Sequence, residues 1–250
     1  MTITLDAAVL AAFVAFCRVG GCFLLMPGLS SVRVPVQVRL FIAVAATVAM
    51  LLHLWDEILP AIDRRPVVLL PLIASELLIG ATLGLLARIY VLALSFIGSA
   101  IAMMIGFTGM AGNGIEEPEP QAALAAIISF SALLLLFVFD FHHEMIRALV
   151  ASYRVAPVGG LFSVQAALVD ITDTLTEAFF VVIRLGSPFV AYAILINLAI
   201  GFVNKLTPQI PVYFISLPFV IAGGMVLLYL SLPILLGLFA DGFLATTIGR

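Results

Sequence analysis

Residues 204–211 read NKLTPQIP and join two long apolar runs, residues 178–203 and 212–240. Each run exceeds the roughly 20 residues that a helix needs to cross a membrane. Prolines disfavour a helical continuation, so the connection must be tight. The sequence therefore predicts a helical hairpin whose turn contains Lys205, Pro208, Gln209 and Pro211. Its second arm is predicted to bend, because it contains Pro218, Gly223, Gly224 and Pro233.

The rest of the chain is also strongly apolar. Of its 250 residues, 64% are hydrophobic and 10% are charged, whereas a soluble domain has about 25% charged residues. The mean hydropathy is +1.29. The formal net charge is −3 and no basic patch is present, which argues against nucleic acid as a partner. These values place the chain in a membrane, in contact with lipid, or in a membrane-bound assembly.

Further apolar segments predict further helices. Residues 7–27 and 40–54 predict two helices joined by a short basic loop, and residues 122–139 lead into an amphipathic helix that ends near Pro157. The stretch from there to Glu177 looks soluble. Basic residues fall in nearly every loop, so the positive-inside rule gives no orientation.

The apolar run of residues 67–110 is too long for one simple membrane span. As a single helix it would reach roughly 66 Å, about twice the thickness of a bilayer core. It therefore either folds back near Arg88 or extends well past the membrane. Gly80 and Gly84 form a GxxxG motif within it, which allows helix backbones to approach closely. We expect close packing here, against a helix that the sequence does not identify.

Four charged residues lie inside the apolar runs, namely Arg18, Glu76, Arg88 and Arg184. An unpaired charge at the centre of a membrane helix costs about 2.5 to 3.5 kcal/mol. Glu76 and Arg88 are about 18 Å apart along one helix, too far to pair within it. We expect these charges to pair between helices or between subunits, with a role in assembly, and snorkelling to the membrane surface is the alternative.

Residues 140–147, DFHHEMIR, place an acid beside two histidines. Adjacent histidines point about 100° apart on a helix, unlike the i, i+4 pair of a zinc site. Asp140 is instead expected to share a face with Glu144, and His143 with Arg147. The chain also lacks the common motifs of hydrolases, metalloproteases and nucleotide-binding enzymes. We therefore expect no enzymatic activity, no catalytic residues, no metal and no cofactor.

Three motifs in order resemble the FliR/SctT/SpaR family of export-gate proteins of type III secretion. The early motif consists of Arg18, Gly20, Pro27, Val34, Pro35 and Arg39. The middle motif is an acid-x-His stretch that runs into IRALVASY, residues 146–153. The last motif is the turn with Pro208, Gln209, Val212 and Pro218. Together they cover essentially the whole chain.

This resemblance implies an all-α membrane protein of long bent helices and helical hairpins. Residues 1–177 would form a FliP-like part, and residues 178–250 a FliQ-like C-terminal hairpin. The implied partners are FliP and FliQ in a core complex, together with FlhA and FlhB and the unfolded flagellar substrates. The implied location is the bacterial inner membrane, at the centre of the flagellar basal body. In such an assembly, apolar length need not equal transmembrane length.

Residues 106–120, GFTGMAGNGIEEPEP, fall at the loop that plugs the closed channel in this family. The resemblance carries over the position of the loop rather than its individual contacts. It implies a plug or gate at Gly106, Phe107, Gly109, Met110, Gly112, Asn113 and Gly114. Glycine frees the backbone to swing aside, while Phe and Met form an adaptable apolar seal. The loop also contains three acids, Glu116, Glu117 and Glu119. Their role is either a solvated anchor or a contact with a neighbouring subunit.

The expected function is that of a flagellar export-gate subunit. An injectisome homologue of virulence type III secretion is the alternative within the family. A small-molecule or ion transporter is the alternative from a different class, and it would need a binding site at the membrane midplane and usually an internal repeat. No such repeat is detected in the sequence.

Overall fold

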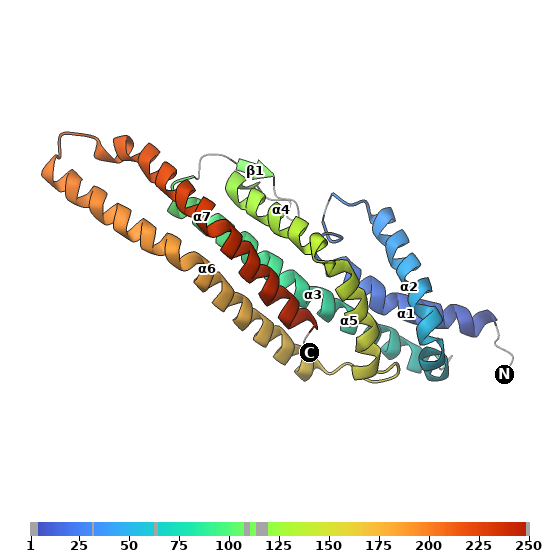
Figure 1. Cartoon of the computed structure of the whole chain (residues 1–250). Coiled ribbons are helices and arrows are strands. Elements are labelled where there is room, and N and C mark those ends of the chain that lie inside the picture. The colour runs from blue at the N-terminus through green and yellow to red at the C-terminus, as the bar shows by residue number, and fades with distance from the viewer. Residues whose placement is uncertain (1–4, 32, 63–64, 108–110, 114–119, 249–250) are drawn as a thin grey trace. The chain divides into compact units, whose positions relative to one another are not determined.

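The computed structural model describes residues 5–31, 33–62, 65–107, 111–113 and 120–248. Helices dominate these ranges (Figure 1). The elements in chain order are α1 (Leu5–Leu25), α2 (Val36–Ile58), the short 3-10 helix η1 (Leu59–Ala61), α3 (Pro66–Met104), β1 (Ala111–Asn113), β2 (Pro120–Ala122), α4 (Ala123–Val138), α5 (Phe141–Val155), α6 (Val164–Leu206) and α7 (Val212–Ile248). Five of these helices are long and apolar enough to cross a membrane, and the bent pair α4–α5 would make a sixth span. The predicted helical membrane fold is confirmed.

Helix α3 settles how the long apolar run of residues 67–110 is used. It begins at a proline, Pro66, where the missing N–H is not needed. It then continues through Arg88 for 39 residues without folding back. It ends at Met104, and Gly106 follows with a φ of 76°, in the left-handed region. Gly106 N–H donates to the Met103 carbonyl at 3.1 Å and Phe107 N–H donates to the Ala102 carbonyl at 2.8 Å. These are the two hydrogen bonds of a Schellman cap, which ends a helix sharply.

Helix α6 includes much of the stretch before Glu177 that looks soluble in the sequence. The helix already begins at Val164 and runs for 43 residues to Leu206. Its first turns are amphipathic, because Ala167 and Thr174 are buried while the residues between them are mostly exposed. Polar composition there marks one face of a helix rather than a loop. The predicted division after residue 177 lies inside this continuous helix.

The chain divides into two compact units, and α3 and α6 contribute residues to both. The first unit comprises residues 1–89, 137–175 and 244–250. Its core is built around α1, from which Val14, Val19 and Cys22 are completely buried. Helix α2 packs against α1. The buried face of the amphipathic helix α5 contributes the core residues Phe141, Met145, Leu149 and Tyr153.

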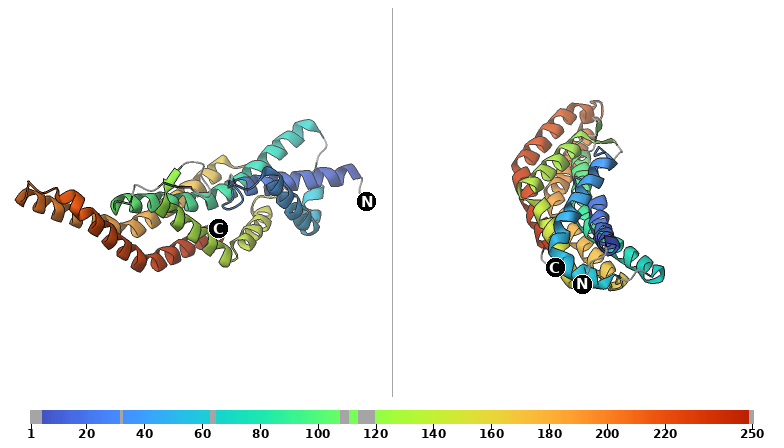
Figure 2. Two further views of the ribbon diagram at one scale, coloured as in Figure 1. Left: turned by 90° about the horizontal axis from the view of Figure 1, so that it is seen from above. Right: turned by 90° about the vertical axis from the view of Figure 1, so that its right-hand side faces the viewer.

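The second unit comprises residues 90–136 and 176–243. Figures 1 and 2 show α6 and α7 side by side and antiparallel, as the predicted hairpin requires. The Tyr192 hydroxyl ties the two arms by donating to the Val220 carbonyl at 2.7 Å. Glycine and alanine allow a second close approach, since a Cβ at Gly98 would lie 3.2 Å from the Ala125 Cα of α4. Helix α7 changes direction along its length (Figure 2), and Pro218 and Pro233 lie within it.

Candidate functional site

Arg18 of α1 and Glu76 of α3 form an ion pair whose two side chains are fully buried. Arg18 Nε donates to Glu76 Oε2 at 2.5 Å, and Arg18 Nη2 donates to Oε1 at 2.8 Å. Two parallel hydrogen bonds from one guanidinium to one carboxylate make the strongest geometry of this kind of pair. The sequence leaves the partners open between another helix and another subunit. The structure pairs these two charges within the chain, between two helices.

The other donors of Arg18 reach the C-terminal end of α5. Nη1 donates to Ser152 Oγ at 3.1 Å, and Nη2 also donates to the Ala156 carbonyl at 2.8 Å. The guanidinium carbon lies 3.9 Å from the centroid of the Tyr153 ring, which is within the range of a cation–π interaction. One buried guanidinium therefore holds α1, α3 and α5 together in the first unit.

Glycines make this contact between α1 and α3 close enough for a pair of charges to meet. A Cβ at Gly80 would overlap the Arg18 carbonyl, and a Cβ at Gly84 would overlap the Cys22 carbonyl. On α1, a Cβ at Gly21 would lie 2.6 Å from the Leu77 carbonyl oxygen. The expectation of close packing at the GxxxG motif is confirmed, and its partner is α1. Gly80 follows Glu76 by four residues on the same helix face, so this crossing presents the carboxylate to Arg18.

The other two intramembrane charges lie elsewhere. Arg88 is half-buried on α3, and Arg184 is exposed on α6. Within the described ranges, neither takes part in the network around Arg18. Ser152, Tyr153 and Ala156 do take part, although they were not predicted as site residues. The residues Ser152 and Tyr153 end the IRALVASY motif, but a polar contact to a helix more than 130 residues earlier leaves no local signal in the sequence.

The predicted plug loop is described in part. Gly106 and Phe107 form the cap of α3, and Gly112 and Asn113 lie in β1. Strands β1 and β2 are antiparallel, with Gly112 opposite Gln121. Gly109, Met110 and Gly114 lie outside the described residues, as do the three acids of the loop. The assignment as a plug therefore stays a prediction.

The predicted hairpin turn lies at the junction of α6 and α7. Lys205 is in the last turn of α6, while Pro208, Gln209 and Pro211 form the connection. Thr207 N–H donates to the Val203 carbonyl at 2.9 Å and caps the end of α6. All residues from 201 to 211 are exposed in the isolated chain. The turn is therefore available to lipid or to a partner.

The DFHHEMIR segment differs from the prediction. Asp140 lies 3.4 Å from His143 Nδ1 and 3.9 Å from His142 Nε2, while Glu144 pairs with Arg147 at 2.6 Å. The ion pairs thus join Asp140 to the histidines and Glu144 to Arg147, whereas the prediction paired Asp140 with Glu144 on one face; His143 and Arg147, four residues apart within α5, do share a face. Asp140 has a left-handed backbone conformation just before α5, so the angular spacing of a regular helix does not apply to it. The three side chains could offer ligands to a metal.

We predict that removing one charge of the Arg18–Glu76 pair lowers the stability of the protein more than removing both. Replacing Glu76 by Gln leaves a buried guanidinium without a counter-charge, which should lower the free energy of unfolding by about 3–5 kcal/mol. The double variant Arg18→Met/Glu76→Met removes both charges and should regain most of that loss. Denaturant unfolding of the detergent-solubilised chain measures both effects, and the single variants Arg18→Met and Glu76→Met complete a double-mutant cycle with the double variant.

A matched control for this cycle is Arg184→Met, which removes an exposed arginine from α6. It should change the free energy of unfolding by no more than about 0.5 kcal/mol. A Glu76→Gln variant as stable as the wild type would contradict the prediction. So would a double variant no more stable than the single ones.

Comparison with known proteins identifies the family of this chain. Residues 9–246 match the family described as bacterial export proteins, family 1. The chain is 28% identical to the flagellar biosynthetic protein FliR of Caulobacter vibrioides over 224 residues, which cover 88% of each protein. It is 26% identical to FliR of Escherichia coli over 84% of this chain and 79% of that protein, and 24% identical to FliR of Aquifex aeolicus over 93% and 89%. The matched region includes Arg18, Glu76 and all of α3 to α6, and the chain therefore belongs to family 1 of the bacterial export proteins.

Proposed function

We propose that this protein is a subunit of the flagellar type III export gate. In this role it helps to form the closed channel through which unfolded flagellar substrates cross the bacterial inner membrane. Membership of the bacterial export family, and relatives named as flagellar biosynthetic proteins, support a component of the flagellar export apparatus. The flagellar names also favour this role over that of an injectisome subunit. Five span-length apolar helices fit a location in the inner membrane.

The observation that carries the gate proposal is the length of the exposed apolar helices. Helices α3, α6 and α7 contain 39, 43 and 37 residues, so they extend roughly 58, 64 and 56 Å. The hydrocarbon core of a bilayer is only about 30 Å thick. To bury all of α6 in lipid would require a tilt of roughly 60°, beyond the range of about 0–40° seen for membrane helices.

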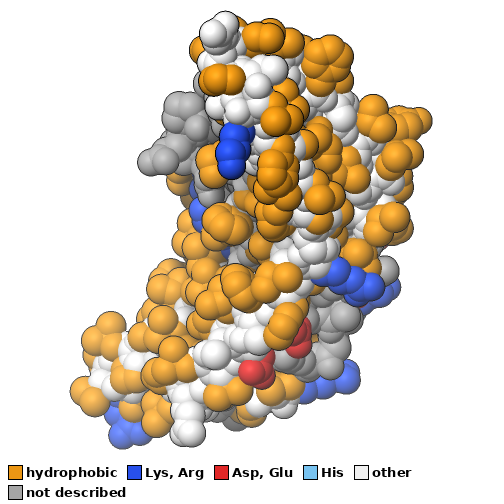
Figure 3. Space-filling view, turned by 90° about the vertical axis from the view of Figure 1, so that its left-hand side faces the viewer, with side chains coloured by type: hydrophobic (Ala, Val, Ile, Leu, Met, Phe, Trp, Pro, Cys, Tyr) orange, Lys and Arg blue, Asp and Glu red, His pale blue; other side chains and the backbone are white. Residues whose placement is uncertain are grey.

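Exposed apolar side chains nevertheless continue along the whole of α6, from one end to the other: Val164, Leu168, Leu175, Phe180, Ile183, Leu195, Phe202 and Leu206. Hydrophobic side chains also predominate on the face drawn in Figure 3, where charges are few. Even at a tilt of about 40°, lipid covers only about 26 residues of such a helix. The remaining apolar surface requires protein partners, as in a gate built from several nested subunits.

The proposed partners follow from the resemblance to the export-gate family. FliP and FliQ are proposed as the neighbours in the core complex, and FlhA and FlhB as further contacts. Residues 1–177 are proposed to act as a FliP-like part and residues 178–250 as a FliQ-like hairpin. The exposed turn at residues 201–211 is a surface on which such neighbours can pack. The loop of residues 106–120 is proposed as the plug, hinged at the glycine cap of α3.

Removal of the gene tests the proposed function. A deletion strain should neither swim nor secrete filament protein, and a plasmid-borne copy should restore both. Filament protein in the culture medium is the direct readout, because swimming can fail for other reasons. Normal export in the deletion strain would end the proposal. Normal swimming with a loss of virulence-type secretion would assign the chain to an injectisome instead.

Deletion of residues 107–114 tests the plug. The assembled gate should then leak ions, since the segment proposed to seal the channel is missing. Membrane conductance of cells or of reconstituted vesicles measures the leak. A matched variant replaces the same eight positions with alternating Gly and Ser, and it should leak as well because Phe107 and Met110 are lost. Gln209→Ala in the α6–α7 turn should not leak, and unchanged conductance in both loop variants would reject the plug.

A further inference from the structure

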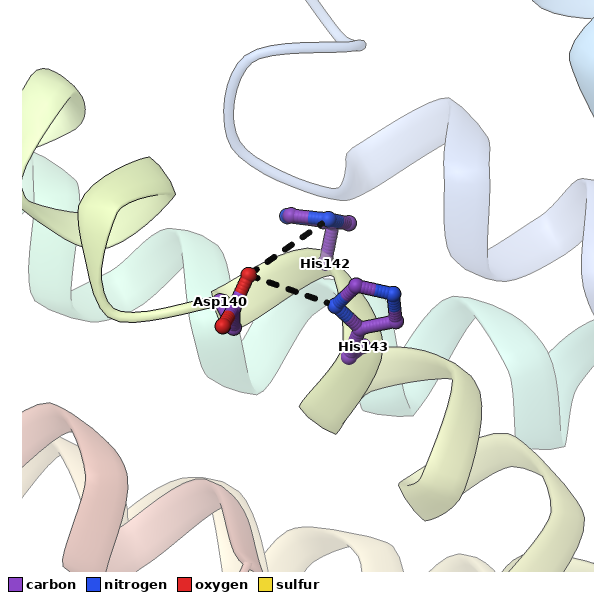
Figure 4. A group of neighbouring side chains, drawn as sticks. All are labelled: Asp140, His142 and His143. Carbon is purple, nitrogen blue, oxygen red and sulfur yellow. Dashed lines mark ion pairs between the residues drawn. The ribbon is translucent and has the colours of Figure 1, made fainter.

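We propose that Asp140, His142 and His143 bind one divalent transition-metal ion of the zinc class, at the joint between α4 and α5. This site is independent of the export role. The three donors lie within four residues of one another in the sequence. Each offers one ligand atom, and all three ligand atoms lie within 4.8 Å of one another. Figure 4 shows both imidazole rings beside the Asp140 carboxylate.

The distances suit a small cation. His143 Nδ1 is 3.4 Å from Asp140 Oδ1, and His142 Nε2 is 3.9 Å from the same oxygen. Zinc binds nitrogen and oxygen ligands at about 2.0–2.2 Å in a tetrahedron, so neighbouring ligand atoms are about 3.3–3.6 Å apart. The donor atoms of His142 and His143 lie within 4.8 Å of each other, so ring movements of no more than about 1.5 Å bring all three donors to this spacing. Two imidazoles and a carboxylate match zinc or a neighbouring first-row metal better than they match magnesium or calcium.

The backbone at Asp140 has an uncommon conformation for a residue other than glycine. Among the described residues, Asp140 is the only one other than glycine with a positive φ, at 56°. Strain of this kind persists where the surroundings impose it, and it concentrates at functional sites. Asp140 also occupies the N-cap position of α5, yet its side chain makes no capping hydrogen bond. Its carboxylate is directed instead to the two imidazoles (Figure 4).

The ring of His142 is held in place by its surroundings. It stacks on Phe137 from the last turn of α4, with ring centroids 5.9 Å apart and an interplanar angle of 28°. Its Nδ1 atom is buried and has no hydrogen-bond partner within the ranges that the structure describes. Nε2 is therefore the nitrogen through which this ring takes part in the cluster. A fixed ring loses little freedom when it binds a metal.

The charges around the cluster, and its place at the bend between two helices, also bear on the binding of a cation. The N-terminus of α5 carries a partial positive charge, which opposes a cation there. The carboxylate of Asp140 offsets this effect, because its Oδ1 lies within 3.9 Å of a nitrogen of each ring. Helices α4 and α5 meet at 66° across this break. A bound ion would join the residue at the bend to the first turn of α5, the helix whose other end holds Arg18 through Ser152 and Ala156.

Metal titration of the full-length chain tests the proposal. The chain is purified in detergent without a histidine tag and stripped with a chelator. Zinc is titrated in competition with a chromophoric chelator, and cobalt by its visible absorption. We expect one ion per chain. His143→Ala and Asp140→Asn should each weaken binding at least tenfold, since changes even outside the ligands cost about 10–100-fold.

Both variants alter exposed side chains, and asparagine tolerates a left-handed backbone conformation, so both should fold. Two controls should bind as the wild type does. His53→Ala removes the remaining histidine of the three in the chain, and Glu144→Gln removes the neighbouring carboxylate that pairs with Arg147. Less than one ion per wild-type chain would overturn the proposal. So would unchanged binding in His143→Ala and Asp140→Asn, or an equal loss in His53→Ala.

Discussion

A positive charge in the middle of an apolar helix is the constraint on which the first unit depends. Arg18 is fully buried, and its cost is acceptable only with a counter-charge and partners for its remaining donors. Glu76 supplies the charge, while Ser152, Ala156 and the Tyr153 ring surround the rest of the guanidinium. The carboxylate reaches Arg18 because Gly80 lets α3 approach the backbone of α1. We infer that the buried pair makes the packing of these helices specific, because a single pairing satisfies the charges, whereas apolar faces alone would accept several registers.

A second constraint comes from length. The apolar faces of α3, α6 and α7 are about twice as long as a bilayer core is thick. In a membrane chain, hydrophobic surface beyond the lipid has to be covered by other protein. Close glycine contacts occur in both units and the buried Arg18–Glu76 pair stabilises the first, while large apolar surfaces stay exposed on both. A subunit of a larger membrane assembly has these properties, and an independent transporter would bury such faces within its own bundle.

Much of the fold could be predicted from the sequence, because apolar periodicity and proline or glycine breaks are local signals. The α6–α7 hairpin, the α4–α5 pair and close packing at Gly80 were predicted in this way. The start of α6 was missed, since a polar helix face resembles a loop when its buried residues are few. The partner of Arg18 could not be found, because pairing depends on which helices meet in space. The group of Asp140 with two histidines was noticed in the sequence, but its geometry was not predicted, because the left-handed conformation of Asp140 takes this residue out of the regular spacing of α5.

Protein, and not lipid alone, is expected to cover the long apolar helices of this chain. Leu168 and Phe202 are exposed near opposite ends of α6 and lie roughly 51 Å apart along it. A photo-crosslinking amino acid placed at each position in turn, in cells with the intact export apparatus, reports what covers that position. We expect crosslinks to other protein subunits from at least one of the two positions, because both cannot lie in the same hydrocarbon core. Lipid adducts alone from both positions would contradict it.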